Sequence, residues 1–215
     1  MKRRTLDIAF SLGGAMFAVL LLILGLVLKD QADFAKDYVK DQLVQQKIEF
    51  PAEYSRGETD VAGSGCLTDY AGTSLDSGEK AECFANFYIK THMLHSAEAA
   101  GYPEDTYDTM GDVVGGLKEE LQAAKDSGDE AAIEEAQAKV DAASGLRDTM
   151  FKGETLRGLL LTTYGFSIFG EKADLAATVC YLAFALLLLL SVAGLVHAFA
   201  SKHAGDVVLS VEHKS

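Results

Sequence analysis

The chain has 215 residues, of which 49% are hydrophobic, and it carries a formal net charge of −13. This acidic balance excludes an obvious nucleic-acid-binding role, which needs a basic face, and it argues against docking onto anionic lipid headgroups. The charge is unevenly distributed: residues 29–174 contain 14 basic and 29 acidic residues, and two uncharged apolar runs flank them.

The first predicted element is a membrane-spanning helix over residues 8–28. This run of 21 residues contains no Asp, Glu, Lys or Arg, and an α-helix needs about 20 apolar residues to cross a bilayer. A cleaved signal peptide is the alternative, but its apolar core has about 7–15 residues and a small-residue cleavage site follows it. Lys29-Asp30-Gln31 follows here instead. We therefore expect an uncleaved anchor, with residues 1–7 as a cytoplasmic N-terminus.

The helical pattern continues past this span to Ile48. We expect Pro51 to end it, because proline disfavours the helical conformation in the residue before it. Residues 52–78 are predicted to be the least ordered part of the chain, since five glycines are interspersed there with Ser, Thr and Asp.

Two cysteines, Cys66 and Cys83, fall in the part of the chain that we expect to be translocated. Thiols pair in oxidising compartments, so a disulfide is predicted that would hold the glycine-rich segment near the next helix. Two free buried thiols are the alternative. Cys180 lies in the second apolar run and is expected to be a small packing residue.

Three outer helices are predicted next, over residues 79–100, 104–126 and 130–150. Asp76 or Ser77 is available as the N-cap of the first, and Pro103 can open the second at its first turn. A short Ser-Gly-Asp turn at 127–129 joins two helices of similar length, which predicts an antiparallel helical hairpin.

The spacing of His92, His95 and Glu98 resembles that of metal ligands. Residues three apart are neighbours on a helix, and imidazole and carboxylate groups suit zinc. A catalytic zinc site normally has three convergent ligands with an ordered second shell, and the sequence shows no second half of such a motif. We expect polar residues on a solvated face, with no metal and no cofactor.

Residues 158–170 form a stretch of 13 residues without a charge. The stretch is too short to cross a membrane, so it is either a core helix of the outer domain or a helix at the membrane interface, where aromatic residues are enriched. We favour a membrane-proximal packing helix that docks a partner. Its candidate docking residues are Leu159, Leu160, Tyr164, Phe166 and Phe169.

The second predicted span covers residues 175–201, followed by a short tail over 202–215. Lys2, Arg3 and Arg4 precede the first span, and short basic flanks stay in the cytoplasm, so both termini should be cytoplasmic and residues 29–174 extracytoplasmic. Small residues in both spans, such as Gly14 and Gly194, predict close packing, either of the spans on each other or on another protein's helices.

Two stretches carry a resemblance to a known group of proteins. They are Lys47-Ile48-Glu49-Phe50-Pro51 and Gly153-Glu154-Thr155-Leu156-Arg157-Gly158-Leu159-Leu160-Leu161, the latter continued by Tyr164 and Phe166. With the overall layout they resemble a group of small two-pass membrane proteins of actinobacteria. The resemblance implies a plasma-membrane location and an extracytoplasmic outer domain, and it implies no catalytic or binding residue.

These observations predict an all-α membrane protein in which two transmembrane helices flank an extracytoplasmic helical bundle. The sequence has no nucleophile elbow, phosphate-binding loop or dinucleotide fingerprint, so we do not expect an enzyme. We expect a non-enzymatic accessory, scaffold or assembly subunit of a larger membrane or cell-envelope complex, which contacts the lipid bilayer and other membrane-protein subunits or copies of itself. A sensory or ligand-binding module with a helical input domain is the first alternative, and a homo-oligomeric channel is the second.

Overall fold

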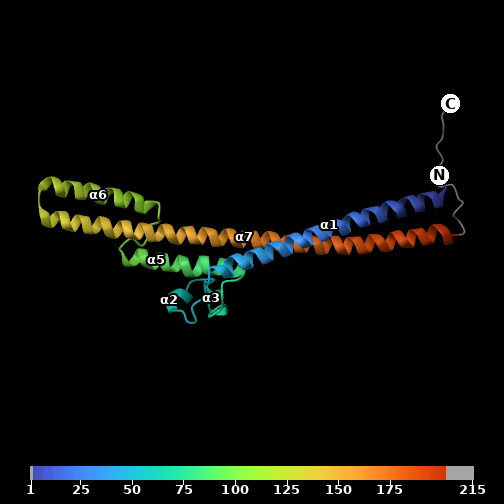
Figure 1. The fold of residues 1–215 in the computed structure, drawn as a ribbon, viewed down its shortest axis with the longest axis horizontal. Helices are drawn as coiled ribbons and strands as arrows, with labels where there is room; N and C mark the ends of the chain where they lie inside the picture. Colours follow the sequence, from blue (N-terminus) through green and yellow to red (C-terminus); the bar gives the residue numbers. More distant parts are fainter. Residues whose placement is uncertain (1, 202–215) are drawn as a thin grey trace, which may run out of the picture. The chain divides into compact units, whose positions relative to one another are not determined.

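The computed structural model describes residues 2–201, and it has helices and no strand in that range. Two compact units divide the chain: a span unit, whose described part comprises residues 2–37 and 168–201, and a helical unit of residues 38–167. The helices, most of them labelled in Figure 1, are α1 (Arg3–Gln45), α2 (Arg56–Thr59), α3 (Gly65–Asp69), α4 (Gly78–Cys83), the π-helix η1 (Phe84–Ile89), α5 (Lys90–Ala99), α6 (Thr109–Ser127) and α7 (Glu130–Ala200).

Helices α1 and α7 each contain a segment long and apolar enough to cross a membrane. Only 17% and 11% of the residues in their most apolar windows are buried, whereas the core helix of a soluble protein would be mostly buried. Large apolar side chains such as Phe10, Leu20, Leu182 and Leu189 are exposed along both segments. This surface suits contact with lipid chains.

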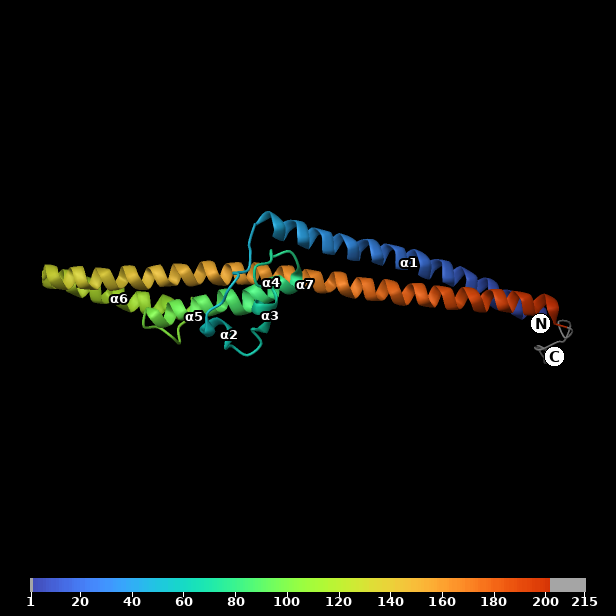
Figure 2. The same cartoon turned by 90° about the horizontal axis from the view of Figure 1, so that it is seen from below.

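Small residues bring the two segments of the span unit together, side by side in Figure 2. A Cβ atom added to Gly14 would lie 2.7 Å from Ser191 Oγ, and one added to Gly194 would lie 3.6 Å from Ser11 Cβ. The two contacts are reciprocal, since each glycine receives a serine of the other helix. The structure thus uses the small residues to pack the two segments on each other, which was one of the two predicted arrangements.

Helix α1 ends earlier than the proline predicts. It stops at Gln45, and Lys47 then takes a positive φ of 53°. The following residues pair with a distant segment, because Leu75 N–H donates to the Ile48 carbonyl and Phe50 N–H donates to the Thr73 carbonyl, both at 2.9 Å. These bonds turn the chain away from the helix before it reaches Pro51, so the predicted end was wrong by several residues.

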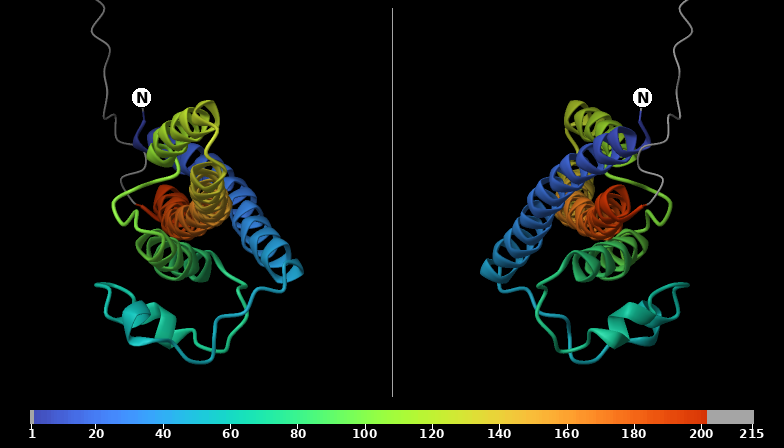
Figure 3. Two further views of the ribbon diagram at one scale, coloured as in Figure 1. Left: turned by 90° about the vertical axis from the view of Figure 1, so that its left-hand side faces the viewer. Right: turned by 90° about the vertical axis from the view of Figure 1, so that its right-hand side faces the viewer.

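The glycine-rich segment 52–78 is more structured than its composition predicts. It contains α2 and α3, which Figure 3 shows to one side of the α5 helix. Leu67 and Leu75 are fully buried. The prediction of a poorly ordered segment was wrong because contacts with residues far along the chain hold it.

The predicted helix 79–100 is present as the continuous run α4–η1–α5. Ser77 is its N-cap, since the Ser77 hydroxyl accepts the Lys80 N–H. A π-helical segment, η1, interrupts the α-helical hydrogen-bond pattern, a feature that the apolar spacing did not predict.

The predicted hairpin is present, and α6 lies alongside the first part of α7 (Figure 1). Gly128, in the left-handed region with a φ of 73°, ends α6, and the Asp129 carboxylate caps α7 by accepting the Ala131 N–H at 3.0 Å. The start of α6 was predicted too early, because residues 101–108 form turns. There, Tyr102 N–H bonds the Ala97 carbonyl and Thr106 N–H bonds Thr109 Oγ1.

Helix α7 runs without a break from Glu130 to Ala200. The sequence predicted three separate segments over this range, at 130–150, 158–170 and 175–201. Glycines and the charged residues at 171–174 marked the expected breaks, but a glycine costs a helix only about 1 kcal/mol relative to alanine, so the helix continues.

Two clusters of buried residues form the core of the helical unit. The first core joins the end of α1, the segment 50–75, the α4–η1–α5 run and Leu160 of α7. The second core lies between the end of α5, α6 and the first part of α7, with Met110 fully buried at its centre. Helix α5 contributes to both cores, through Met93 to the first and through Ala97 to the second.

Candidate functional site

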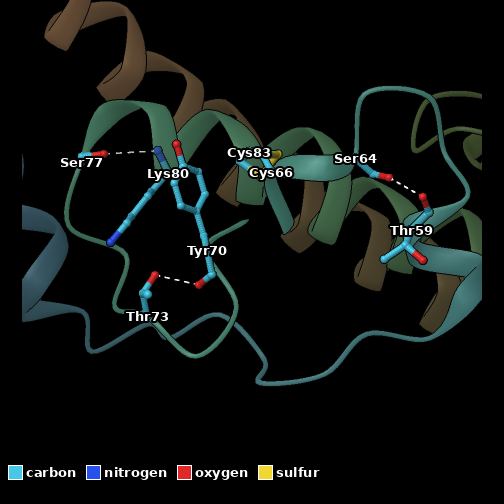
Figure 4. The surroundings of a disulfide bond; sticks show 8 residues. All are labelled: Thr59, Ser64, Cys66, Tyr70, Thr73, Ser77, Lys80 and Cys83. Atoms are coloured by element: carbon cyan, nitrogen blue, oxygen red, sulfur yellow. Dashed lines mark hydrogen bonds between the residues drawn. A yellow bond between two sulfur atoms is a disulfide. The ribbon is translucent and has the colours of Figure 1, made fainter. Parts of the chain in front are cut away.

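A disulfide joins α3 to α4 (Figure 4). The Cys66 and Cys83 sulfurs are 1.99 Å apart, and the two residues lie seventeen positions apart in the sequence, at a Cα–Cα distance of 6.2 Å. Cys83 is buried in the first core. Local hydrogen bonds organise the loop that the disulfide closes, since Thr73 Oγ1 donates to the Tyr70 carbonyl at 2.7 Å.

Aromatic rings line the first core beside the disulfide. Phe50 meets Phe84 edge-on with ring centroids 5.2 Å apart. The Phe84–Tyr88 and Tyr88–His92 pairs are tilted, with centroids 4.6 Å and 4.3 Å apart. The series runs from the buried interior at Phe84 to the exposed His92 ring. The last ring of the series, His92, lies beside the carboxylate of Glu58.

Glu58 belongs to a capping box at the start of α2. Its carboxylate accepts both the Ser55 N–H and the Ser55 hydroxyl at 2.7 Å, and it lies 3.6 Å from His92 Nε2. Burial of the carboxyl acts to raise its pKa, but the Ser55 hydrogen bonds and the nearby His92 and His95 rings hold the pKa of Glu58 below its ordinary value. The carboxylate is thus kept charged.

Tyr54 lies next to this carboxylate. Its hydroxyl is buried without a hydrogen-bond partner among residues 2–201. Burial, with the neighbouring Tyr88 and Glu58, raises the pKa of Tyr54 to about 12. The hydroxyl therefore stays neutral at physiological pH.

Of the three residues with metal-like spacing, His92 and His95 both lie near α2, at Glu58 and Gly57, whereas Glu98 is not part of these contacts. His92 Nδ1 donates to the Tyr88 carbonyl at 2.9 Å, and a Cβ atom on Gly57 would lie 3.4 Å from the His95 ring. Glu98 is exposed. Within residues 2–201 no group of three or more His, Cys, Asp or Glu side chains could hold a metal ion.

The predicted docking segment is part of α7, and its residues divide between two environments. Leu160 is only 2% exposed and packs in the first core, so it cannot dock a partner, and its place in the prediction is corrected. Tyr164 is half-buried. Leu159 is 62% exposed and Phe166 is 39% exposed in the helical unit, whereas Phe169, in the span unit, is 76% exposed.

The two stretches that carry the resemblance meet in the first core. Phe50 of the first stretch and Leu160 of the second are both buried there, and Leu156 packs against the same cluster. Arg157 Nε donates to the Ala85 carbonyl of η1 at 3.0 Å, and Arg157 Nη1 bonds Glu154 at 2.7 Å. These residues therefore have clear structural roles in holding α7 to the α4–η1–α5 run.

Sequence reasoning missed Glu58 and Arg157 as organising residues. Glu58 had a local signal, because Ser55-Arg56-Gly57-Glu58 has the Ser-x-x-Glu spacing of a capping box. Arg157 had none, since its acceptor belongs to a π-helix 72 residues away.

In comparisons with models of known protein families, with curated proteins and with solved structures, no match to the chain is found.

Proposed function

We propose that the chain is a non-enzymatic accessory, scaffold or assembly subunit of a larger membrane or cell-envelope complex. In this proposal α1 and α7 anchor it in the plasma membrane, both termini are cytoplasmic, and the helical unit is extracytoplasmic. The basic residues before the first apolar run support this orientation, and the disulfide fits an oxidising compartment.

The observation that carries the proposal is an exposed apolar strip on α7 in the helical unit, formed by Leu159 and Phe166. Residues seven apart lie on the same face of a helix, and both side chains are exposed. Tyr38 of α1 contacts the Phe166 ring edge-on, with centroids 6.0 Å apart, and is itself half exposed. Exposed apolar faces of this kind mark contacts with protein or membrane.

Affinity purification tests the proposal. Tagged full-length chain would be extracted from its native membrane in mild detergent, and co-purifying chains would be identified by mass spectrometry. We expect one reproducible, near-stoichiometric complex, which is lost in the variants Leu159→Glu and Phe166→Glu. The variant Ala142→Glu, which adds the same charge at an exposed position of α7, should retain it.

Site-specific photo-crosslinking provides a second readout. A photoreactive amino acid at position 159 should form an adduct with the partner, whereas one at position 134 should not, because the two positions are about 37 Å apart along the helix at about 1.5 Å per residue. A lone monomer in both experiments would refute the proposal. A homo-oligomer without other chains would instead direct attention to self-association.

The orientation is tested separately. Single cysteines introduced at positions within 29–174 should react with a membrane-impermeant maleimide that is added to intact cells. Cysteines introduced before residue 8 should not react. The opposite pattern of labelling would overturn the proposed topology.

A further inference from the structure

A pocket opens between α6 and α7 in the helical unit, away from the disulfide and from the exposed strip of α7. Its volume is about 270 Å³, just below the range of about 300–1,000 Å³ that is typical of ligand sites. The residues that line it are Tyr107, Val114, Lys118, Ser144, Arg147, Asp148 and Phe151. Aromatic and apolar walls are thus combined with two cationic side chains.

Arg147 is the central polar group of the pocket. Its guanidinium carbon lies 4.4 Å from the centroid of the Tyr107 ring, a cation–π distance. The guanidinium also lies against α6 at Gly111, where an added Cβ atom would be 3.6 Å from both Nε and Nη2. The guanidinium is therefore in contact with the Tyr107 ring and close to α6 at Gly111.

The Arg147 Nε–H is buried and has no hydrogen-bond partner within residues 2–201. A buried donor without an acceptor is unfavourable, because its hydration is lost and not replaced. Arg157, in the same helical unit, has acceptors for its guanidinium: its Nε donates to the Ala85 carbonyl and its Nη1 donates to the Glu154 carboxylate. Arg147 forms no such ion pair in the described part of the chain, so its positive charge is left for an anion in the pocket, although the buried Nε–H itself is out of reach of one.

The charges around the pocket favour an anion. Lys118 lines it from α6 and forms no ion pair within the described range. Asp148 also lines it, but its carboxylate is paired with Lys152 one turn further along α7. The lining thus holds two cations and one acid that is paired elsewhere, a balance that favours an anion over a cation.

The remaining walls favour an apolar or aromatic body. The Tyr107 and Phe151 rings lie 5.4 Å apart at 46°, and Val114 contributes an aliphatic surface. A planar guanidinium matches a carboxylate with two parallel hydrogen bonds. The pocket thus presents aromatic and aliphatic side chains next to a cationic group.

We propose that this pocket is a binding site for a small organic carboxylate with an aromatic or otherwise flat apolar body. Arg147 and Lys118 hold the carboxylate, and Tyr107 and Phe151 contact the body. This inference goes beyond the proposed scaffold function, which needs no small ligand, and it is independent of the exposed strip at Leu159.

Benzoate is the probe for the test, used with the full chain in lipid nanodiscs and with protein-free nanodiscs as the blank. We expect saturable binding by ligand-observed NMR, with a dissociation constant on the order of 1 mM for so small a ligand. Inorganic phosphate carries negative charge but has no aromatic ring, and benzyl alcohol has the aromatic ring but no charge. We expect at least tenfold weaker binding of both.

Three variants locate the site. Arg147→Gln and Lys118→Gln should weaken benzoate binding at least tenfold and severalfold, respectively, and Ser144→Leu should abolish it by filling the pocket. Lys139→Gln removes a charge from the same helix but outside the pocket, where Lys139 pairs with Glu135 at 2.7 Å, and should leave binding unchanged. Circular dichroism would check that each variant is folded. If Arg147→Gln loosens the hairpin, the exposed Lys118 and the pocket-filling Ser144→Leu decide the question.

Absence of saturable binding, or binding that Lys118→Gln and Ser144→Leu leave unchanged, would overturn the proposal. Equal affinity for phosphate and benzoate would also overturn it, since the aromatic walls would then contribute nothing.

Discussion

Replacing Gly78 with alanine should separate α4 from α7. Gly78 is buried at the first position of α4, and a Cβ atom there would overlap the Ser167 hydroxyl and lie 2.5 Å from Ser167 Cβ. Real Cβ contacts do not approach so closely, and Ser167 Cβ is fixed to the helix backbone. The helices must therefore move apart for Gly78→Ala to fold.

The magnitude follows from two opposing effects. Overpacking of this kind costs about 1–3 kcal/mol, whereas alanine gains up to about 1 kcal/mol over glycine in a helix, and less at the first position. We expect a net loss of about 1–2 kcal/mol. For a chain of this size that corresponds to a lowering of Tm by about 2–8 °C.

A double-mutant cycle with Ser167→Gly isolates the contact. Ser167→Gly alone should cost about 1 kcal/mol through helix propensity. In that background the added Cβ of Gly78→Ala meets only Tyr164 Cα at 3.5 Å, an ordinary van der Waals distance, so the second substitution should be neutral or slightly stabilising. The predicted coupling energy is about 1–3 kcal/mol.

Thermal unfolding in detergent, followed by circular dichroism and by protease susceptibility of the helical unit, measures the four states of the cycle. Gly165→Ala on α7 is the matched control: no atom lies within 4 Å of its added Cβ, and it should be neutral or stabilising. Additive effects of Gly78→Ala and Ser167→Gly would show that the two helices do not meet here, and would refute the reasoning.

Three further predictions concern other parts of the molecule. Reduction of the disulfide should destabilise the helical unit by roughly 3 kcal/mol on the chain-entropy model, measured as a lower Tm with reductant; an unchanged Tm would contradict it. Because the pKa of Glu58 is lowered in the folded state from its ordinary 4.5, the charged form contributes stability above pH 4.5 that is lost as pH falls through the folded pKa. The stability gap between the wild type and Glu58→Gln should therefore narrow in acid, and a constant gap would refute the shift. In a Cys180→Ser background, Ser11→Cys with Gly194→Cys should cross-link on oxidation, since their Cβ atoms would lie 3.6 Å apart, whereas Gly13→Cys with Gly194→Cys should not.

Local signals in the sequence predicted the elements whose cause is local. Two apolar runs gave the membrane-compatible parts of α1 and α7, and the turn at 127–129 gave the hairpin. The pairing of Cys66 with Cys83 followed from the expected compartment rather than from geometry. Each of these inferences needed only a window of neighbouring residues or the overall layout.

The errors arose where distant residues decide the structure. Helix α1 ends before Pro51 because residues 48–50 form backbone hydrogen bonds with residues 73–75. The residues next to Pro51 in the sequence do not predict that pairing. The same bonds order the glycine-rich segment. Conversely, α7 continues through positions that locally predict breaks, because the breaks are weak compared with the packing of Leu160 and Met150 in two cores.

The candidate sites likewise divide into one that the sequence indicates locally and one that depends on residues far apart in the chain. The exposed strip at Leu159 and Phe166 was within reach of the sequence, since an uncharged stretch with aromatic residues is visible in it, but only the structure separates these two side chains from the buried Leu160. The Arg147 pocket was out of reach. Its components come from the turn before α6, from α6 and from α7, up to 44 residues apart between Tyr107 and Phe151, and an arginine in an acidic helix has no sequence signal.

The hairpin turn explains why the pocket can nevertheless be a stable feature. Gly128 and Asp129 fix where α7 starts relative to α6. The second core, between α6 and the first part of α7, fixes the faces that the two helices present to each other. A shift of one residue along α7 would rotate it by about 100° and would move Arg147 away from Tyr107. Burial of Leu146 and Met150 on one face of α7 therefore places the guanidinium on the adjacent face, where we propose that it binds an anion.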